Sequence, residues 1–368
     1  MASATLSRSL SPSATWRAVI WSRSASALLL ATFFWMVAAA GFSGFLGKWG
    51  LRDGATRFSI ERMLDGNAHR PFVYRQMLPI AANAADRLLP DSLKHRLADR
   101  LSPQQTFTST PGLTDPDLRF RYIVVCYLSF LALFACLFVL REITLDAGAG
   151  NLAALVAPAT LVLALPYLQT VGGYFYDCSE LFFLSLAFLL AGRGKVLWLF
   201  ALAAPAALNK ESFFFFIPAL YPLLAMRLPK ERAAAAIAAA MLIAGLVTAA
   251  LEIRFASAAG GTTELHFLTN LSLYALPHSY RETELTYGII GPAGSSLATL
   301  LLLLIVAARG VPACPRPIRQ HLLIATAVNL PLFLVFGMAG ELRNLSLLFV
   351  GLVILIAKGI ESGREGVQ

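Results

Sequence analysis

The chain has 368 residues, of which 57% are hydrophobic and only 14% are charged, and its formal net charge is +9. A soluble globular domain has about 25% charged residues, so this composition excludes an ordinary soluble domain and predicts a polytopic membrane protein. The basic residues stand between apolar runs and do not line one amphipathic face, which argues against a nucleic-acid partner.

The chain begins with a polar segment that precedes the first apolar run. Residues 1–24 are rich in Ser and Arg and contain no acidic residue, and residues 25–47 are long and apolar enough to span a bilayer. We predict a cytoplasmic N-terminal tail over residues 1–24 and an uncleaved first membrane helix. Signal-peptide cleavage after Ala40 is the alternative.

A long polar loop follows, over residues 48–119. Apolar residues recur at helical spacing around residues 58–64 and 77–88, and Asp91 is placed to begin another helix that ends near Leu101. Short amphipathic helices of this kind lie in the membrane interface and direct Arg and Lys towards headgroups. The sequence therefore predicts a structured loop with interfacial helices.

Nine further apolar runs follow the loop. They fall at residues 120–140, 151–171, 178–192, 196–208, 212–226, 233–252, 293–308, 321–339 and 344–358. Three of these runs, within residues 178–226, are shorter than the ~20 residues that cross a bilayer, which predicts tilted or broken helices. We predict an all-α, polytopic transmembrane helix bundle of about ten spans in one domain over residues 25–358, with a cytoplasmic C-terminal tail over residues 359–368.

The charges on the short loops predict an orientation. Alternate loops carry most of the basic residues, among them Arg141, Arg193, Arg227, Arg316 and Lys358. The positive-inside tendency makes this side cytoplasmic, so both termini lie in the cytoplasm and residues 48–119 lie outside it. A bacterial inner membrane is the expected location.

The predicted outer side receives charged residues that have no role in topology. They are Asp53, Asp65, Arg70, Arg75, Asp177, Glu180, Lys210, Glu211, Glu341 and Arg343. Ionisable groups at membrane depth are costly and usually face a polar cavity or each other. Because several separate hairpins bring such groups to one side, the sequence predicts a shared pocket, and the arginines suit bidentate binding of phosphate.

Each of these groups also has a purely structural interpretation, which the sequence leaves open. The Asp53-Gly54 pair could form only a turn, and Asp177 could only stabilise the start of a helix. The Lys210-Glu211 pair, and likewise Glu341 with Arg343, could neutralise itself within a turn. The arginines of the first loop could anchor interfacial helices to phospholipid headgroups.

Three segments resemble the C-type superfamily of membrane glycosyltransferases, especially its bacterial branches. Asp53-Gly54 takes the place of the acidic residue that follows the first span in that superfamily. Residues 70–79 are similar to a Tyr-Arg…Leu-Pro segment of bacterial members, and residues 209–211 resemble an Asn-Lys/Arg-Glu element. The chain departs from the better-known members because it has no clear second carboxylate beside Asp53.

The resemblance implies an inverting transfer of a sugar from a polyprenyl-phosphate donor to an extracytoplasmic glycan, lipid or protein acceptor. Asp53 is then the expected general base. The residues expected to bind the donor phosphate are Arg70, Tyr74, Arg75, Lys210 and Arg343. The residues expected to support the pocket are Asp177, Glu180, Glu211 and Glu341.

Two further expectations concern cofactors and the alternative function. A divalent cation is a possible cofactor, although the sequence assigns it no ligands. The expected partners are the lipid-linked sugar, membrane lipids and an acceptor of unknown class. The alternative to a glycosyltransferase is a transporter or flippase for an anionic lipid-linked or small anionic substrate, because broken helices and charges within the membrane suit that function too.

Overall fold

The computed structural model describes residues 12–102, 111–261 and 264–365. Within these ranges the chain is mostly helical, and seven helices are long and apolar enough to cross a membrane. The candidate spans are Ser24–Trp49 within α1 (Pro12–Trp49), α6 (Pro116–Asp146), α7 (Asn151–Leu168), α8 (Phe175–Gly192), α12 (Lys230–Arg254), α15 (Arg316–Phe336), and Leu342–Gly363, which joins η4 (Leu342–Leu348) to α16 (Phe349–Glu365). The prediction of a helical, multi-pass membrane protein is confirmed.

Three apolar segments of the described chain are shorter. They are α9 (Val196–Asn209), the interrupted run of α10 (Ser212–Phe216), η2 (Ile217–Leu220) and α11 (Tyr221–Leu224), and α14 (Leu297–Ala313). Pro218 and Pro222 stand in the interrupted run, where proline lacks the N–H that a continuous helix would use. The total of about ten spans and the orientation of the termini stay predictions.

Helix α1 differs from its expected boundary. It begins at Pro12 and runs without interruption for 38 residues, so it includes half of the segment that the sequence analysis assigned to a tail. Its residues up to Ser24 contain neither glycine nor a second proline, and nothing in them ends a helix. Residues 1–11 and 366–368 of the predicted tails lie outside the described residues.

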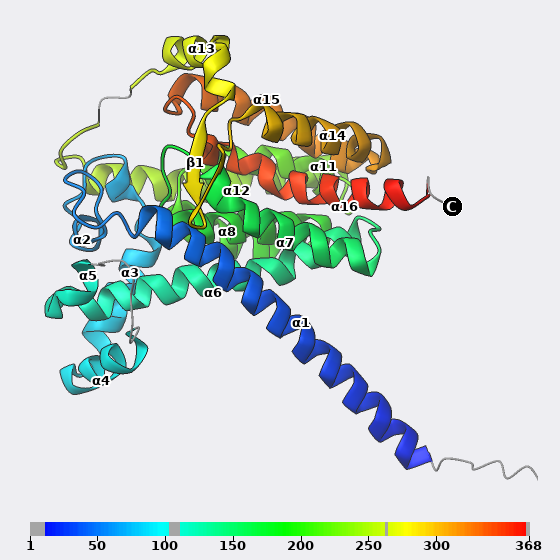
Figure 1. Cartoon of the computed structure of the whole chain (residues 1–368), viewed down its shortest axis with the longest axis horizontal. Coiled ribbons are helices and arrows are strands. Elements are labelled where there is room, and N and C mark those ends of the chain that lie inside the picture. The colour runs from blue at the N-terminus through cyan, green and yellow to red at the C-terminus, as the bar shows by residue number, and fades with distance from the viewer. Residues whose placement is uncertain (1–11, 103–110, 262–263, 366–368) are drawn as a thin grey trace, which may run out of the picture.

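Short helices of the first loop gather at one end of the bundle (Figure 1). They are α2 (Ile60–Leu64), η1 (Phe72–Tyr74), α3 (Met77–Leu88), α4 (Asp91–Leu101) and α5 (Pro111–Thr114). Helix α3 buries Leu78, Pro79 and Ala82 against the bundle and leaves the apolar side chains of Ile80 and Leu88 exposed. The C-terminal end of α16 lies at the opposite end of the bundle (Figure 1).

The segment between α12 and α14 contains α13 (Phe267–Ala275), η3 (Pro277–Tyr280) and a small antiparallel hairpin. The hairpin pairs β1 (Thr283–Thr286) with β2 (Ile289–Pro292) and turns at Tyr287 and Gly288, both of which have positive φ. Lys48 at the end of α1 forms a 2.9 Å ion pair with Glu284. The hairpin therefore lies against the first span, and the sequence analysis did not predict it.

Helix α8 lies at the centre of the bundle and packs against α6, α9 and α16. Of its residues 72% are buried, whereas only 28% of the apolar window of α12 is buried. Charges on α8 are thus held inside the protein, while much of α12 faces outward, where lipid would surround it. This difference positions the candidate site.

Candidate functional site

The N-terminal end of α8 carries two carboxylates into the interior of the bundle, one in the first turn and one in the second. Asp177 and Glu180 stand three residues apart, so they share one face of the helix. Their side chains are only 10% and 4% exposed. Asp177 accepts a 2.9 Å hydrogen bond from the backbone N–H of Tyr174, which stabilises the start of α8. Capping, one of the two interpretations left open, is therefore present, but it uses only one carboxylate oxygen.

Lys210 reaches these carboxylates from the break between α9 and α10. Its Nζ atom lies 2.7 Å from Glu180 and 3.8 Å from Asp177. The chain leaves the helical conformation at Lys210, which has φ −163° and ψ 137°. Asn209 holds this break in place by donating a 3.1 Å hydrogen bond to the carbonyl of Tyr176. The break therefore directs the lysine inward.

Arg75 comes from the first loop and pairs with Glu211. Its guanidinium donates to the two carboxylate oxygens at 2.6 and 3.4 Å, and it donates to the hydroxyl of Tyr176 at 2.7 Å. Burial would raise the pKa of Glu211, but the attraction and hydrogen bond of Arg75, together with a backbone hydrogen bond and the charge of Lys210, hold that pKa below its ordinary value. The neighbours Lys210 and Glu211 thus pair with different partners, so neutralisation within the turn is not what the structure shows.

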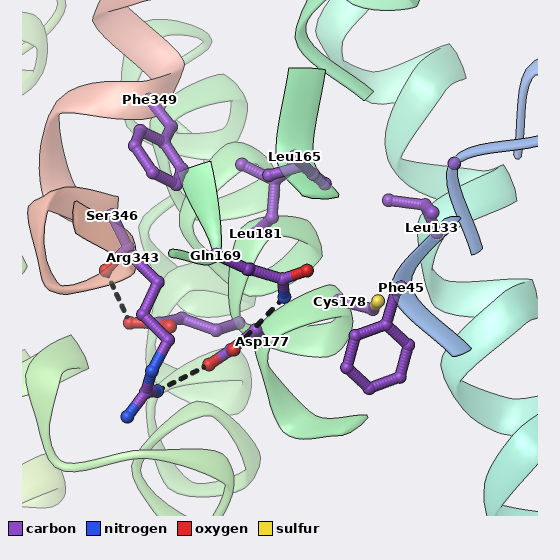
Figure 2. Close-up of a pocket in the computed structure, with 12 residues that line it drawn as sticks. Phe45, Leu133, Leu165, Gln169, Asp177, Cys178, Leu181, Arg343, Ser346 and Phe349 are labelled. Carbon is purple, nitrogen blue, oxygen red and sulfur yellow. Dashed lines mark hydrogen bonds and ion pairs between the residues drawn. The ribbon is translucent and has the colours of Figure 1, made fainter. Parts of the chain in front are cut away.

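Arg343 closes the site from the start of the last span. It donates to Glu341 at 2.6 and 2.9 Å and to Asp177 at 3.0 Å. Figure 2 shows its side chain reaching towards Asp177. Here the pairing between near neighbours does occur, because Glu341 binds Arg343, and it extends to a helix far away in the sequence.

Two tyrosines hold these charges together. The rings of Tyr174 and Tyr176 are stacked, with centroids 5.1 Å apart. The guanidinium of Arg343 lies 4.4 Å from the ring of Tyr174, and that of Arg75 lies 4.8 Å from the ring of Tyr176. Cations at these distances are attracted to aromatic faces, so the tyrosines supply both packing and electrostatic support.

Arg52 is a fourth cation here, and the sequence analysis missed it. It has a φ of 63°, which is unusual for a residue other than glycine. Its guanidinium lies 4.2 Å from the ring of Trp49 and 4.8 Å from that of Tyr174, and it donates to the carbonyl of Gly173 at 3.0 Å. A Cβ at Gly172 would come within 2.9 Å of it, so the glycine leaves the room that Arg52 occupies.

We call this group the charge cluster. It comprises the cations Arg52, Arg75, Lys210 and Arg343 and the carboxylates Asp177, Glu180, Glu211 and Glu341. Four positive and four negative charges cancel, as buried charges must if the desolvation cost is to be offset. The structure brings together seven of the residues that the sequence analysis selected.

Asp53 lies in the first loop, as Arg75 does, and its side chain contacts α6. Its Oδ2 atom accepts hydrogen bonds from the backbone N–H of Leu51 at 3.1 Å and from the hydroxyl of Tyr122 on α6 at 3.2 Å. The side chain is half-buried. Arg52 and Asp53 are adjacent, yet one side chain turns to the charge cluster and the other to α6.

Arg70 and Tyr74 have other surroundings. The backbone N–H of Arg70 donates to Ala259 at 2.8 Å, and its side chain donates to the carbonyl of Gly260, so Arg70 ties the first loop to the segment that follows α12. Tyr74 is half-buried in η1 and packs against the hydrophobic core. Their assignment to the donor phosphate stays a prediction.

A narrow cavity adjoins the charge cluster (Figure 2). Asp177, Glu180, Arg343 and Gln169 form its polar side, and the apolar side includes Phe45, Leu133, Leu165, Leu181 and Phe349. Its volume is about 20 Å³, which is room for about one water molecule. A sugar or a lipid phosphate therefore enters only if neighbouring side chains move.

The described residues offer no ligand set for a divalent cation. Across residues 12–102, 111–261 and 264–365, no group of three or more His, Cys, Asp or Glu side chains could hold a metal ion. The carboxylates of the charge cluster are engaged by arginine, lysine and serine donors instead.

The arrangement can bind an anion once one of the carboxylates yields, and it can stabilise negative charge that develops on a leaving group. Its three predicted cations come from segments far apart in the sequence, namely residues 75, 210 and 343.

Comparison with known proteins assigns the chain to no family: no family model matches it, and no curated protein matches it at a significant level.

Proposed function

We propose that the chain is an integral membrane glycosyltransferase that moves a sugar from a polyprenyl-phosphate donor to an extracytoplasmic glycan, lipid or protein acceptor. The observation that carries this proposal is the convergence of Arg75, Lys210 and Arg343 on two stacked tyrosines. Cations on an aromatic platform within a membrane bundle suit a lipid-linked phosphate, whose head is anionic and whose tail is apolar.

The balance of charges indicates how the phosphate would enter. An added anion would leave the charge cluster with excess negative charge, so one carboxylate must give way. The side chain of Glu211 is 34% exposed, whereas that of Glu180 is 4% exposed. Glu211 can therefore turn to solvent at the lowest cost, and Arg75 is the cation it releases to the phosphate.

The chemistry is a single displacement. A hydroxyl of the acceptor attacks the anomeric carbon and loses its proton to Asp53, which acts as general base. The bond between the anomeric carbon and the phosphate oxygen breaks, and the lipid phosphate leaves with the electron pair. Arg75, with Lys210 and Arg343 behind it, stabilises the charge that develops on the phosphate. One displacement inverts the anomeric configuration.

The test is incubation of purified protein with a radiolabelled polyprenyl-phosphate sugar and cell-envelope acceptors. Asp53→Asn keeps the shape of the side chain but cannot take the proton, so the rate should fall about 10²–10⁴-fold while donor binding survives. Asp99→Asn is the matched control, because Asp99 is a first-loop carboxylate that is 68% exposed. A folded Asp53→Asn protein with full transfer activity would remove Asp53 from catalysis.

A transporter or flippase is the second candidate, and the break between α9 and α10 favours it. Charged residues 210 and 211 stand between two short apolar helices, as they do where broken helices bind substrates in transporters. Movement of a labelled anionic lipid across vesicles, without sugar transfer and regardless of Asp53, would support this function over the first.

A further inference from the structure

A second and larger cavity opens between α3 and the end of α12, and we call it the α3–α12 cavity. Its volume is about 430 Å³, which lies within the range of small-molecule sites. Arg87, Asn83 and Gln76 line it from the α3 side, and Arg254 and Phe255 line it from the α12 side. One of its lining residues, Gln76, directly follows Arg75 of the charge cluster in the chain.

The α3–α12 cavity has uncompensated positive charge. Arg87 and Arg254 are both exposed. Among residues 12–102, 111–261 and 264–365, neither has a carboxylate within ion-pair distance. The guanidinium of Arg254 lies 5.2 Å from the ring of Phe255. The one carboxylate of the lining, Asp65, is already paired with Arg121 at 2.8 Å.

The two arginines also lie where phospholipid headgroups are expected. Arg254 is the last residue of α12, a candidate span that is largely unburied, so its head marks the end of the apolar segment. Arg87 lies in the last turn of α3, a helix whose apolar residues Ile80 and Leu88 are 43% and 81% exposed. A helix with such an exposed apolar face lies in the interface.

We propose that the α3–α12 cavity binds the phosphate of an anionic glycerophospholipid. Arg87 and Arg254 bind the phosphate from two sides, since a guanidinium donates bidentate hydrogen bonds to phosphate oxygens. Ile80 and Phe255 contact the glycerol backbone and the first methylene groups of the acyl chains. The lipid would join the first loop to α12. This inference does not depend on sugar transfer.

The test compares the binding of phosphatidylglycerol and phosphatidylcholine to the purified full chain in detergent, by native mass spectrometry. The wild-type protein should prefer the anionic lipid. In Arg87→Gln/Arg254→Gln, the affinity for phosphatidylglycerol should fall about tenfold or more. Arg87→Lys/Arg254→Lys keeps both charges and should recover most of the preference.

The control is Arg96→Gln/Arg100→Gln, which removes two exposed charges from the neighbouring interfacial helix α4. It should change the affinity by no more than about twofold. The proposal is overturned if Arg87→Gln/Arg254→Gln binds the anionic lipid as the wild-type protein does, or if the control loses as much affinity. Displacement of the lipid by millimolar inorganic phosphate would also overturn it, because the site would then take the free ion.

Discussion

The cations of the charge cluster and those of the α3–α12 cavity have opposite surroundings, although Arg75 of the cluster and Gln76 of the cavity are neighbours in the chain. In the cluster, Arg75, Lys210 and Arg343 are buried and each has a carboxylate within 3.0 Å. In the cavity, the arginines are exposed and have no ion-pair partner among the described residues. Burial makes compensation obligatory, because an unpaired charge inside the protein costs several kcal/mol. Exposure leaves a cation free for an anion from outside.

This comparison predicts that the cluster cations contribute to folding as well as to donor binding, whereas the cavity cations contribute to binding but little to folding. The largest effect should come from Lys210→Met, which removes the cation that pairs with Glu180, whose side chain is only 4% exposed in the structure. Removing one partner of a buried pair costs about 3–5 kcal/mol. The free energy of unfolding in detergent, measured by denaturant titration, should fall by that amount.

Two further variants separate this effect from general damage. Lys195→Met removes an exposed lysine and should leave the free energy of unfolding nearly unchanged. Lys210→Met/Glu180→Met removes both members of the pair and should recover most of the loss, because apolar replacement of a buried pair is often neutral. If Lys210→Met is as stable as the wild-type protein, Lys210 is not a structural cation.

The second prediction concerns the affinity for the donor: substitution of Arg75 should lower it, and substitution of its partner Glu211 should raise it. Arg75→Ala removes a charge-assisted contact, which should weaken donor binding by about 1.5–3 kcal/mol. Glu211→Gln frees Arg75 and should strengthen it. Equilibrium binding of a labelled polyprenyl-phosphate sugar measures both variants. Weaker binding by Glu211→Gln would show that Glu211 does not compete with the phosphate.

The bundle was predictable because apolar runs must satisfy their own backbone hydrogen bonds in a membrane, so helices follow from hydropathy. The hairpin was not predictable in the same way. Its strands, Thr283–Thr286 and Ile289–Pro292, have four residues each, too few for an alternating pattern to be recognised. The start of α1 at Pro12 was missed because the polar residues there carry no apolar periodicity.

The site was predictable as a set of residues but not as a set of pairs. Lys210 and Arg343 were selected because they have no role in topology. Their partners depend on tertiary contacts: Arg75 and Glu211 are 136 residues apart. Arg52 was missed because only its backbone conformation, with a φ of 63°, turns it away from its neighbour Asp53. The residue type alone does not predict that backbone conformation.

The third prediction uses pH to test the pairing of Arg75 with Glu211. The pKa of Glu211 is lowered in the folded protein, so the stabilisation is present above the unfolded value of about 4.3 and is lost as pH falls through the folded value. Because Glu211 is 34% exposed, solvent screening limits the effect to about 1 kcal/mol. The stability difference between the wild-type protein and Glu211→Gln should therefore be largest above about pH 4.3 and should shrink as pH falls below that value. A difference that does not shrink as pH is lowered through the acidic range would contradict the pairing.

The smallest effect should come from the cavity. Arg87→Gln and Arg254→Gln remove exposed cations that have no ion-pair partner in the described chain, so each should change the free energy of unfolding by about 0.5 kcal/mol or less. The small loss of stability comes from the attraction between each arginine and the C-terminal end of its own helix, because both residues stand in a last turn.

The measurement is denaturant titration in a detergent without anionic lipid, and repetition with added phosphatidylglycerol gives the contrast. A lipid that binds only the folded protein stabilises it in proportion to its affinity. The wild-type protein should therefore gain stability from the lipid, and the two variants should gain less. A loss of several kcal/mol without lipid would place Arg87 or Arg254 among the structural cations, and the distinction between the two regions would no longer hold.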